Sequence, residues 1–252
     1  MRKYMIAGNW KMNMLRHEAT ELTQNIISGV ADIKHDLDIL LAPPFTSLDV
    51  VRGLIEGTKI KLSAQDVFWK DRGAYTGEVS PAMLIDAGCE WTIIGHSERR
   101  GILGESDEIV RRKIDTSLND GLKIIVCVGE TLSQREEGKT IDVVRSQVES
   151  ALSGLEVSDF SRIVIAYEPV WAIGTGENAT PEQAEEVHAA IREITGNIFG
   201  QGSEIMRIIY GGSVKVDNIK KLLEMDNIDG ALIGGAGLNA ESFVSIVKIA
   251  GE

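Results

Sequence analysis

The sequence contains few cysteines and no long apolar run. Cys89 and Cys127 are the only cysteines among 252 residues, too few for a disulfide framework, so we expect a reducing compartment. No apolar stretch approaches the roughly 20 residues that span a bilayer. Asn9 and Lys11 interrupt the apolar start of the chain, so no secretory leader is predicted. These features predict a cytoplasmic protein with no membrane partner.

Positively charged residues are outnumbered by negatively charged ones. The chain carries 26 Lys and Arg residues against 38 Asp and Glu residues, a net charge of -12. Such an acidic protein is not expected to bind nucleic acid or an anionic membrane surface. The same charge repels an anionic small molecule from most of the surface. If the ligand is an anion, local groups must outweigh the overall field.

The usual motifs for metals and nucleotide cofactors are missing. No H-E-x-x-H or C-x-x-C spacing is present. Residues 174–179 and 235–240 fit the dinucleotide pattern G-x-G-x-x-A. The second has too few residues after it for a βαβ unit, and the first leads to a strand ending at Tyr210 without the carboxylate that binds a ribose. We therefore predict neither a metal nor a cofactor.

Eight short apolar segments recur along the chain, rich in Ile, Val and Leu. They alternate little with polar residues, as expected of strands that are covered on both faces. The segments are residues 4–10, 37–42, 59–64, 91–95, 123–128, 162–167, 204–210 and 230–234.

Helical patterns lie between the apolar segments. One begins with Thr180 as N-cap, Pro181 at the first position and Gln183 completing a capping box. Ser80 and Pro81 repeat this opening. A strand followed by a helix, eight times in about 250 residues, predicts an α/β fold, the closed (β/α)8 barrel with parallel strands, as one domain over the whole chain. An open doubly wound sheet is the alternative.

Polar residues follow several of the predicted strands. The first strand ends in Asn9 and Lys11, the fourth in His96 and the sixth in Glu168. Chemistry in such barrels lies at the carboxyl ends of the strands. Each residue alone has an ordinary interpretation as a solvated lysine, a hydrogen-bonded histidine or a turn glutamate. Their shared position at the barrel mouth favours a catalytic role.

Strand geometry bears on the direction of these side chains. Because successive side chains point to opposite faces, we expect His96 on the same face as Ile94 and Glu168 on the same face as Ala166. Two glycine-rich stretches, residues 211–213 and 234–235, follow the last two strands. Backbone N–H groups approach a phosphate closely where no Cβ intervenes, so these loops predict a phosphate site. A pair of tight turns is the alternative explanation.

Five motifs together resemble the triosephosphate isomerase family, from the first strand to the last. They are "AGNWKMN" (7–13), "IIGHSERR" (93–100), "VCVGE" (126–130), "AYEPVWAIGTG" (166–176) and "YGGSV" (210–214). The resemblance implies that the chain interconverts dihydroxyacetone phosphate and D-glyceraldehyde 3-phosphate by proton transfer through an enediolate, a step of glycolysis and gluconeogenesis. No cofactor is implied.

The resemblance also assigns roles near the reacting atoms. Glu168 is implied as the base and His96 as the electrophile, with Lys11 and Asn9 near the reacting oxygens and Glu98 as a supporting carboxylate. Burial under a closed lid is expected to raise the pKa of Glu168, and a helix N-terminus to lower that of His96.

Further roles concern the phosphate and the lid. The implied phosphate-binding residues are Gly174, Ser213, Gly234 and Gly235. The lid would run from Pro169, which stiffens its near hinge, to Gly176. The loop from Gly73 to Ser80 resembles the one that enters a partner subunit, which implies a homodimer with Thr76 reaching the neighbouring site.

Three positions depart from the family pattern. Asp66 stands where Asn is common, Glu177 where Lys is frequent and Gly237 where Ser is usual. Two other functions remain open at this point. An isomerase of aminoaldose phosphates would carry an acid after the first strand, where this chain has Asn9 and Lys11. A non-catalytic phosphate-binding scaffold would not need these polar side chains at the mouth.

Overall fold

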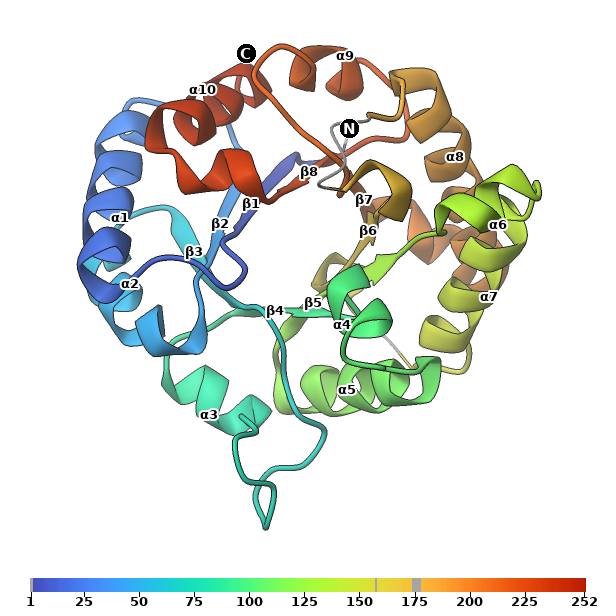
Figure 1. The fold of residues 1–252 in the computed structure, drawn as a ribbon, viewed down its shortest axis with the longest axis horizontal. Coiled ribbons are helices and arrows are strands. Elements are labelled where there is room, and N and C mark those ends of the chain that lie inside the picture. Colours follow the sequence, from blue (N-terminus) through green and yellow to red (C-terminus); the bar gives the residue numbers. More distant parts are fainter. Residues whose placement is uncertain (1, 157, 174–177) are drawn as a thin grey trace.

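Eight parallel strands close into a barrel in chain order in the computed structural model, which describes residues 2–156, 158–173 and 178–252 (Figure 1). Met5 pairs with Asp38 on one side and with Gly230 on the other, which joins the first strand to the last. The predicted closed barrel is confirmed. The strands are β1 (Met5–Asn9), β2 (Asp38–Ala42), β3 (Ile60–Ala64), β4 (Trp91–Ile94), β5 (Lys123–Val128), β6 (Ile163–Tyr167), β7 (Arg207–Tyr210) and β8 (Gly230–Ile233).

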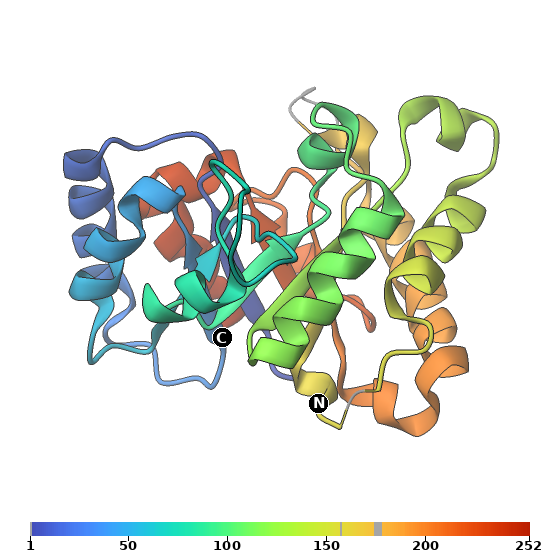
Figure 2. The same cartoon turned by 90° about the horizontal axis from the view of Figure 1, so that it is seen from below.

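Helices form a ring around the barrel and stand alongside the strands when it is seen from the side (Figure 2). The first helix packs against the last one. The helices of the described residues are α1 (Arg16–Val30), α2 (Leu48–Ile55), α3 (Pro81–Asp86), α4 (Ser97–Gly101), α5 (Asp107–Asp120), α6 (Leu132–Glu136), α7 (Thr140–Leu152), α8 (Pro181–Phe199), α9 (Ile219–Leu223) and α10 (Ala240–Ala250). Within this part of the chain, every helix is too short or too polar to reach across a lipid bilayer.

Local sequence signals predicted most helix and strand boundaries. The Thr180 hydroxyl accepts from the backbone of Gln183 at 3.2 Å, and the Gln183 side chain accepts from the backbone of Thr180 at 3.0 Å, so the predicted capping box begins α8. The main strand error is at β7, whose predicted start at Glu204 falls in a 3-10 helix, Gly200–Ile205. The Ser203 hydroxyl donates to the carbonyl of Gly200 at 2.8 Å and supports this turn.

Two apolar layers hold the barrel together. One fills its interior, and the larger one lies between the strands and the helices. Trp91, the first residue of β4, is buried at the amino-terminal end of the strands. The Lys123 ammonium and the Arg207 guanidinium lie 5.5 and 5.4 Å from the centre of its ring, so packed and charged side chains meet at this end.

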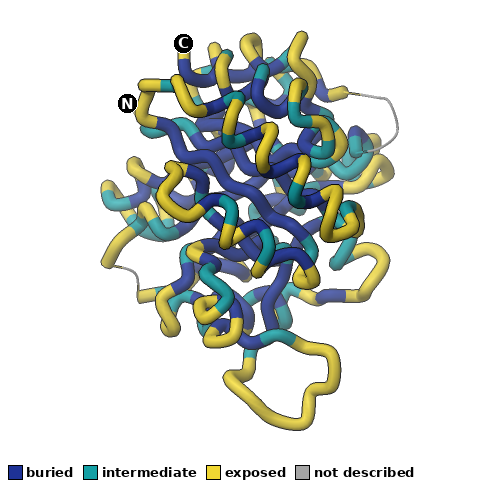
Figure 3. The backbone as a smooth tube through the Cα atoms, turned by 90° about the vertical axis from the view of Figure 1, so that its left-hand side faces the viewer, coloured by how far each residue is buried: buried dark blue, intermediate teal, exposed yellow. Residues whose placement is uncertain are grey.

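The chain between β3 and α3 projects away from the barrel as a long loop (Figures 1 and 3). Residues 71–78 of this loop are exposed throughout. Phe68 stacks on Trp69 with ring centres 4.0 Å apart and also contacts Tyr75 at 4.7 Å, so its base is packed on itself. This is the segment for which the sequence predicts contact with a partner subunit.

Candidate active site

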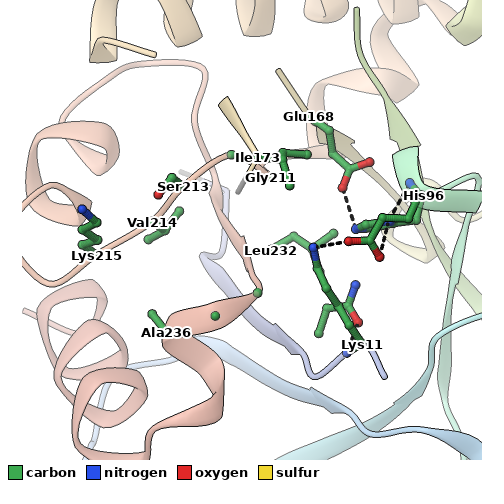
Figure 4. Close-up of a pocket in the computed structure, with 15 residues that line it drawn as sticks. Lys11, His96, Glu168, Ile173, Gly211, Ser213, Val214, Lys215, Leu232 and Ala236 are labelled. Carbon is green, nitrogen blue, oxygen red and sulfur yellow. Dashed lines mark hydrogen bonds and ion pairs between the residues drawn. The ribbon is translucent and has the colours of Figure 1, made fainter. Parts of the chain in front are cut away.

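A cavity of about 520 Å³ opens at the carboxyl ends of the strands (Figure 4). It brings together residues that follow β1, β4, β6, β7 and β8. The predicted residues that line it are Asn9, Lys11, His96, Glu98, Glu168, Ser213, Gly234 and Gly235. The predicted phosphate-binding Gly174, the end of the lid and the departure at Glu177 lie outside the described residues.

His96 reaches the cavity by a different route from the one that strand alternation predicts. Ile93 faces the barrel interior, whereas Ile94 faces the helices, so the expectation that His96 shares the inner face with Ile94 is wrong. Gly95, with φ of +72°, ends the alternation and turns the chain so that His96 faces the mouth. A Cβ at Gly95 would lie 3.0 Å from the Arg100 guanidinium, so packing as well as backbone conformation favours glycine.

The side chains of His96 and Glu168 are in direct contact. Nε2 of His96 lies 2.9 Å from Oε1 of Glu168, while Oε2 accepts from the backbone N–H of Ser97 at 2.8 Å. The backbone N–H of Glu98 donates to Nδ1 of His96 at 3.2 Å. Because Nδ1 is an acceptor in this arrangement, the imidazole carries its hydrogen on Nε2, facing the carboxylate.

This contact determines the direction in which the pKa of each group is shifted. Burial acts to lower the pKa of His96, but the adjacent Glu168 carboxylate outweighs it and raises that pKa. Burial acts to raise the pKa of Glu168, but His96 and the Ser97 N–H outweigh it and lower that pKa. The direction for His96 is opposite to the one expected from the sequence, because the carboxylate rests against the imidazole in this structure. The rise expected for Glu168 concerns a closed lid, and the end of that lid lies outside the described residues.

Lys11 lies in the left-handed backbone region, with φ of +52°. This conformation costs free energy for any residue other than glycine. Its N–H donates to the side chain of Asn9 at 3.0 Å, and Nε2 of Gln65 donates to its carbonyl at 2.8 Å. Its ammonium lies 2.6 Å from Oε1 of Glu98. This role of Gln65 was not predicted, because Lys11 is 54 residues away in the sequence and no local motif indicates the contact.

The glycines after β7 are required by packing. A Cβ on Gly211 would lie 2.8 Å from Cγ of Glu168, and a Cβ on Gly212 would lie 2.2 Å from the Tyr210 hydroxyl. In contrast, a Cβ on Gly235 would meet no atom of the described residues within 4 Å. None of these glycines has a positive φ, so the backbone conformation alone does not require glycine at these positions. The N–H of Gly237 donates to the carbonyl of Gly234 at 2.8 Å, so the loop after β8 does form a tight turn.

The loops after β7 and β8 present backbone hydrogen-bond donors to the cavity. The backbone N–H groups of Gly212, Ser213 and Gly235 have no backbone acceptor within the described residues. Lys215, a second site residue that was not predicted, lies at the rim beyond Ser213 (Figure 4). Its side chain is exposed, and no carboxylate of the described residues lies within 4.0 Å of it. This end of the cavity suits an anion.

The near hinge of the predicted lid is tied to a buried carboxylate. Glu130 accepts from the Trp171 indole at 2.9 Å, from the Tyr167 hydroxyl at 3.1 Å and from Arg135 at 3.2 Å. The Arg135 guanidinium also lies 4.6 Å from the centre of the Trp171 ring. The chain leaving β6 is therefore anchored before it reaches the cavity at Ile173.

The departure at Gly237 leaves the cavity unchanged. A Cβ there would lie 3.6 Å from the Cα of Gly8 and 3.8 Å from Ile233, which are ordinary contacts, so the site has room for serine as well. Among the described residues, no group of three or more His, Cys, Asp or Glu side chains is arranged to hold a metal ion.

The closed parallel barrel, with its polar cavity at the carboxyl ends of the strands, places the chain in the class of (β/α)8-barrel enzymes. Comparison with known proteins narrows this class. The family model for triosephosphate isomerase matches residues 4–250. The chain belongs to the triosephosphate isomerase family.

Curated relatives agree over nearly the whole chain. A protein named triosephosphate isomerase from Geobacter metallireducens is 52% identical over 249 residues, which are 98% of this chain and 99% of the relative. One of the same name from Caldanaerobacter subterraneus subsp. tengcongensis is 52% identical over 249 residues, covering 98% of this chain and 100% of the relative. One from Chloroherpeton thalassium is 52% identical over 251 residues, covering 99% and 100%.

Proposed function

We propose that Glu168, His96 and Lys11 interconvert dihydroxyacetone phosphate and D-glyceraldehyde 3-phosphate in the described cavity. As a member of its family the protein is an isomerase of triose phosphates, and the reaction belongs to glycolysis and gluconeogenesis. The observation that supports these roles is that an ammonium, an imidazole and a carboxylate from three different strands converge on one small cavity. A scaffold that only binds phosphate has no need of this convergence.

Glu168 is the base that moves a proton between the two carbons. In the structure it rests on the Ser97 N–H and on His96, so it must leave both to reach a substrate carbon. When the carboxylate leaves these partners and is covered by the lid, it loses the groups that lower its pKa, while its burial still raises the pKa. The pKa then rises toward that of an effective base. Each pKa unit corresponds to about 1.36 kcal/mol of difference between the two protonation states.

His96 is the neutral donor to the two oxygens of the substrate. When Glu168 swings away, His96 loses the neighbour that raises its pKa, and burial then favours the uncharged ring. The Glu98 N–H holds Nδ1 as an acceptor, so the hydrogen stays on Nε2, which faces the cavity. The ring thus donates to an oxygen on which negative charge develops.

Lys11 and Asn9 stabilise the enediolate. The Lys11 ammonium is fixed by Glu98 in the free protein, and an arriving anion competes with that carboxylate for it. The Asn9 side chain holds the strained backbone of Lys11, so it also acts through that residue. A positive charge at this point helps to offset the net charge of -12 of the whole chain.

The phosphate is held by backbone N–H groups of Ser213, Gly234 and Gly235, together with Gly174. This assignment is supported by the backbone donors of these loops that lack a backbone acceptor among the described residues. Phosphate binding is remote from the reacting carbons, so its free energy drives closure of the lid from Pro169 to Gly176. A closed lid keeps water out and protects the enediolate from losing its phosphate.

The protein functions as a homodimer through the loop from Gly73 to Ser80, in which the exposed Thr76 reaches the neighbouring site. Large apolar side chains are exposed on segments that follow β1 to β4, four adjacent strands, and this supports an interface there. They are Met12, Leu15, Phe45, Tyr75, Met83, Ile85, Ile102 and Leu103. Each subunit is one barrel domain over residues 1–252. The two free, buried cysteines fit a cytoplasmic location.

The direct test is a coupled assay of the purified protein with glyceraldehyde 3-phosphate, with an aminoaldose phosphate as the alternative substrate. We expect rapid turnover of the triose phosphate and none of the aminoaldose phosphate. A protein that binds inorganic phosphate but leaves triose phosphates unchanged would be a scaffold, and the proposal would fail.

A further inference from the structure

One arginine side chain holds the turn at the end of β4. Nε of Arg100 donates to the carbonyl of Gly95 at 2.8 Å, so this contact closes a loop over residues 96–98. The enclosed residues supply the imidazole of the site, the N–H that holds the Glu168 carboxylate and the carboxylate that contacts Lys11. Three functional groups therefore lie between the two ends of a single hydrogen bond.

The Gly95 carbonyl depends on this arginine. Gly95 is buried, and no backbone N–H of the described residues donates to its carbonyl. A buried carbonyl without a donor costs free energy, so the backbone is favoured where the guanidinium reaches it. The guanidinium also covers the open face of Gly95, where a Cβ would lie 3.0 Å from Nη2 and 3.3 Å from Nε of Arg100. Both contacts hold the positive φ that turns the chain toward the barrel mouth.

The guanidinium is itself anchored to two other elements. Its Nη1 donates to Oδ1 of Asp107, the first residue of α5, at 2.6 Å. Its Nη2 donates to the carbonyl of Cys127 in β5 at 3.4 Å, which is a longer contact. The Asp107 side chain is 40% exposed, so this ion pair contributes little stability by itself. What it provides is a fixed direction for the planar guanidinium.

A second cavity, of about 240 Å³, lies behind the base. Glu168 lines both this cavity and the one at the mouth, so its side chain lies between the two. Arg100 and Gly95 also line the second cavity, and the exposed Gly101 is part of the same lining, which gives solvent a route to it. Water can then reach the Gly95 carbonyl when the arginine is removed. A variant without Arg100 is therefore expected to fold but to lose the fixed turn.

We propose that Arg100 is a positioning residue for the isomerisation: its guanidinium closes the loop over residues 96–98 and thereby fixes the His96 imidazole and the Ser97 N–H against the base. This inference rests on the proposed function of His96 and Glu168. Arg100 lies outside the lining of the substrate cavity, so its effect on turnover needs no contact with the substrate.

Arg162 provides a matched control at the opposite end of the barrel. It is half-buried like Arg100, and its guanidinium also donates to two backbone carbonyls, those of Leu118 at 2.7 Å and Leu122 at 3.0 Å. It directly precedes β6, whereas Arg100 follows β4. Removing either side chain deletes one positive charge and the hydrogen bonds to two carbonyls. A difference in kinetics between the two variants therefore reports the place of the arginine, not its general contribution to the fold.

The experiment compares the wild-type chain with Arg100→Ala and Arg162→Ala. For each, kcat and KM are measured in both directions at several protein concentrations, alongside thermal unfolding. We expect Arg100→Ala to lower kcat about tenfold with KM within about threefold of wild type, and Arg162→Ala to lower Tm with kcat kept. A normal kcat in Arg100→Ala, or an equal loss in both variants, would overturn the inference. An inactive wild-type chain would instead remove the proposed function.

Free guanidinium supplies a readout that a folding defect does not move. The space left by the side chain in Arg100→Ala joins the second cavity, so a guanidinium ion can take its place. About 50 mM guanidinium chloride is far below the molar range that unfolds proteins. We expect it to raise the kcat of Arg100→Ala severalfold, with no such effect on the wild type, on Arg162→Ala, or from potassium chloride at the same concentration. An Arg100→Ala kcat that guanidinium leaves unchanged, or an equal rise in all three proteins, would contradict the role of this group.

Arg100→Lys is the second variant, for use if Arg100→Ala does not fold. Lysine keeps the charge, but its single ammonium cannot bind the Gly95 carbonyl, Asp107 and the Cys127 carbonyl in the same geometry. We expect a loss of kcat with KM kept, whereas Arg162→Lys should match the wild type. Wild-type kinetics in Arg100→Lys would show that the charge alone suffices, and the proposed role of the guanidinium would fail.

Discussion

Substituting alanine for Gly211 tests whether this glycine makes room for the base or serves only the phosphate. The added Cβ would lie 2.8 Å from Cγ of Glu168 and 3.2 Å from the carbonyl of Tyr167. Methyl groups do not approach this closely, and the backbone of β6 is held by the barrel, so the Glu168 side chain is the part that must move. Overpacking of this kind costs about 1–3 kcal/mol.

The displacement acts on the residue that transfers the proton. A shift of about 1 Å in a catalytic group lowers turnover by about 100-fold. We therefore expect Gly211→Ala to lower kcat by about that factor, with a much smaller change in KM. Steady-state kinetics in both directions, with thermal unfolding to confirm a folded protein, measures both quantities.

Gly235→Ala is the matched control on the other glycine-rich loop. A Cβ there meets no described protein atom within 4 Å, so it is tolerated by the fold and occupies space where the phosphate is proposed to bind. We expect KM to rise about tenfold with kcat nearly kept. If Gly211→Ala retained normal kcat, or if both variants changed only KM, the view that Gly211 makes room for Glu168 would be wrong.

The remaining predictions concern charge. Glu168→Gln should lower kcat by about 10³-fold or more while substrate binding is largely kept, since it removes the base but little volume; near-normal turnover would exclude Glu168 as the base. Lys11→Met should weaken both binding and turnover, because it removes the cation next to Glu98, and unchanged affinity in a binding assay would contradict this. Lys215→Met should lower kcat/KM about threefold at low salt and less at high salt, whereas Lys220→Met, an exposed lysine outside the cavity, should not. An equal effect of the two lysine variants would assign the loss to net charge.

Local patterns in the sequence predict much of this fold. Strands buried on both faces appear as apolar runs, and their limits are mostly within one residue of the observed ones. The caps at Thr180 and Ser80 were predictable because an N-cap involves only the next few residues. The position of Lys11 and Glu168 at the barrel mouth was also predictable, since all strands of a parallel barrel end at one rim.

Where the direction of a side chain depends on more than its own strand, the prediction is weaker. The alternation argument for His96 is wrong, because Gly95 adopts a positive φ that apolar periodicity does not reveal. The interpretation of Gly211 as a phosphate residue misses its contact with Glu168, since these two residues are brought together only by the pairing of β6 and β7.

The sequence by itself determined the barrel, the order of its strands and the residue types at its mouth, because those depend on short-range periodicity and on how parallel strands must connect. Only the tertiary structure decided the pKa directions of His96 and Glu168, the support of Lys11 by Gln65 and the pairing of Asp66 with Lys113 and Arg99. Each of these depends on atoms from distant parts of the chain lying within about 3 Å of each other, and hydrogen bonding and desolvation are set at that range.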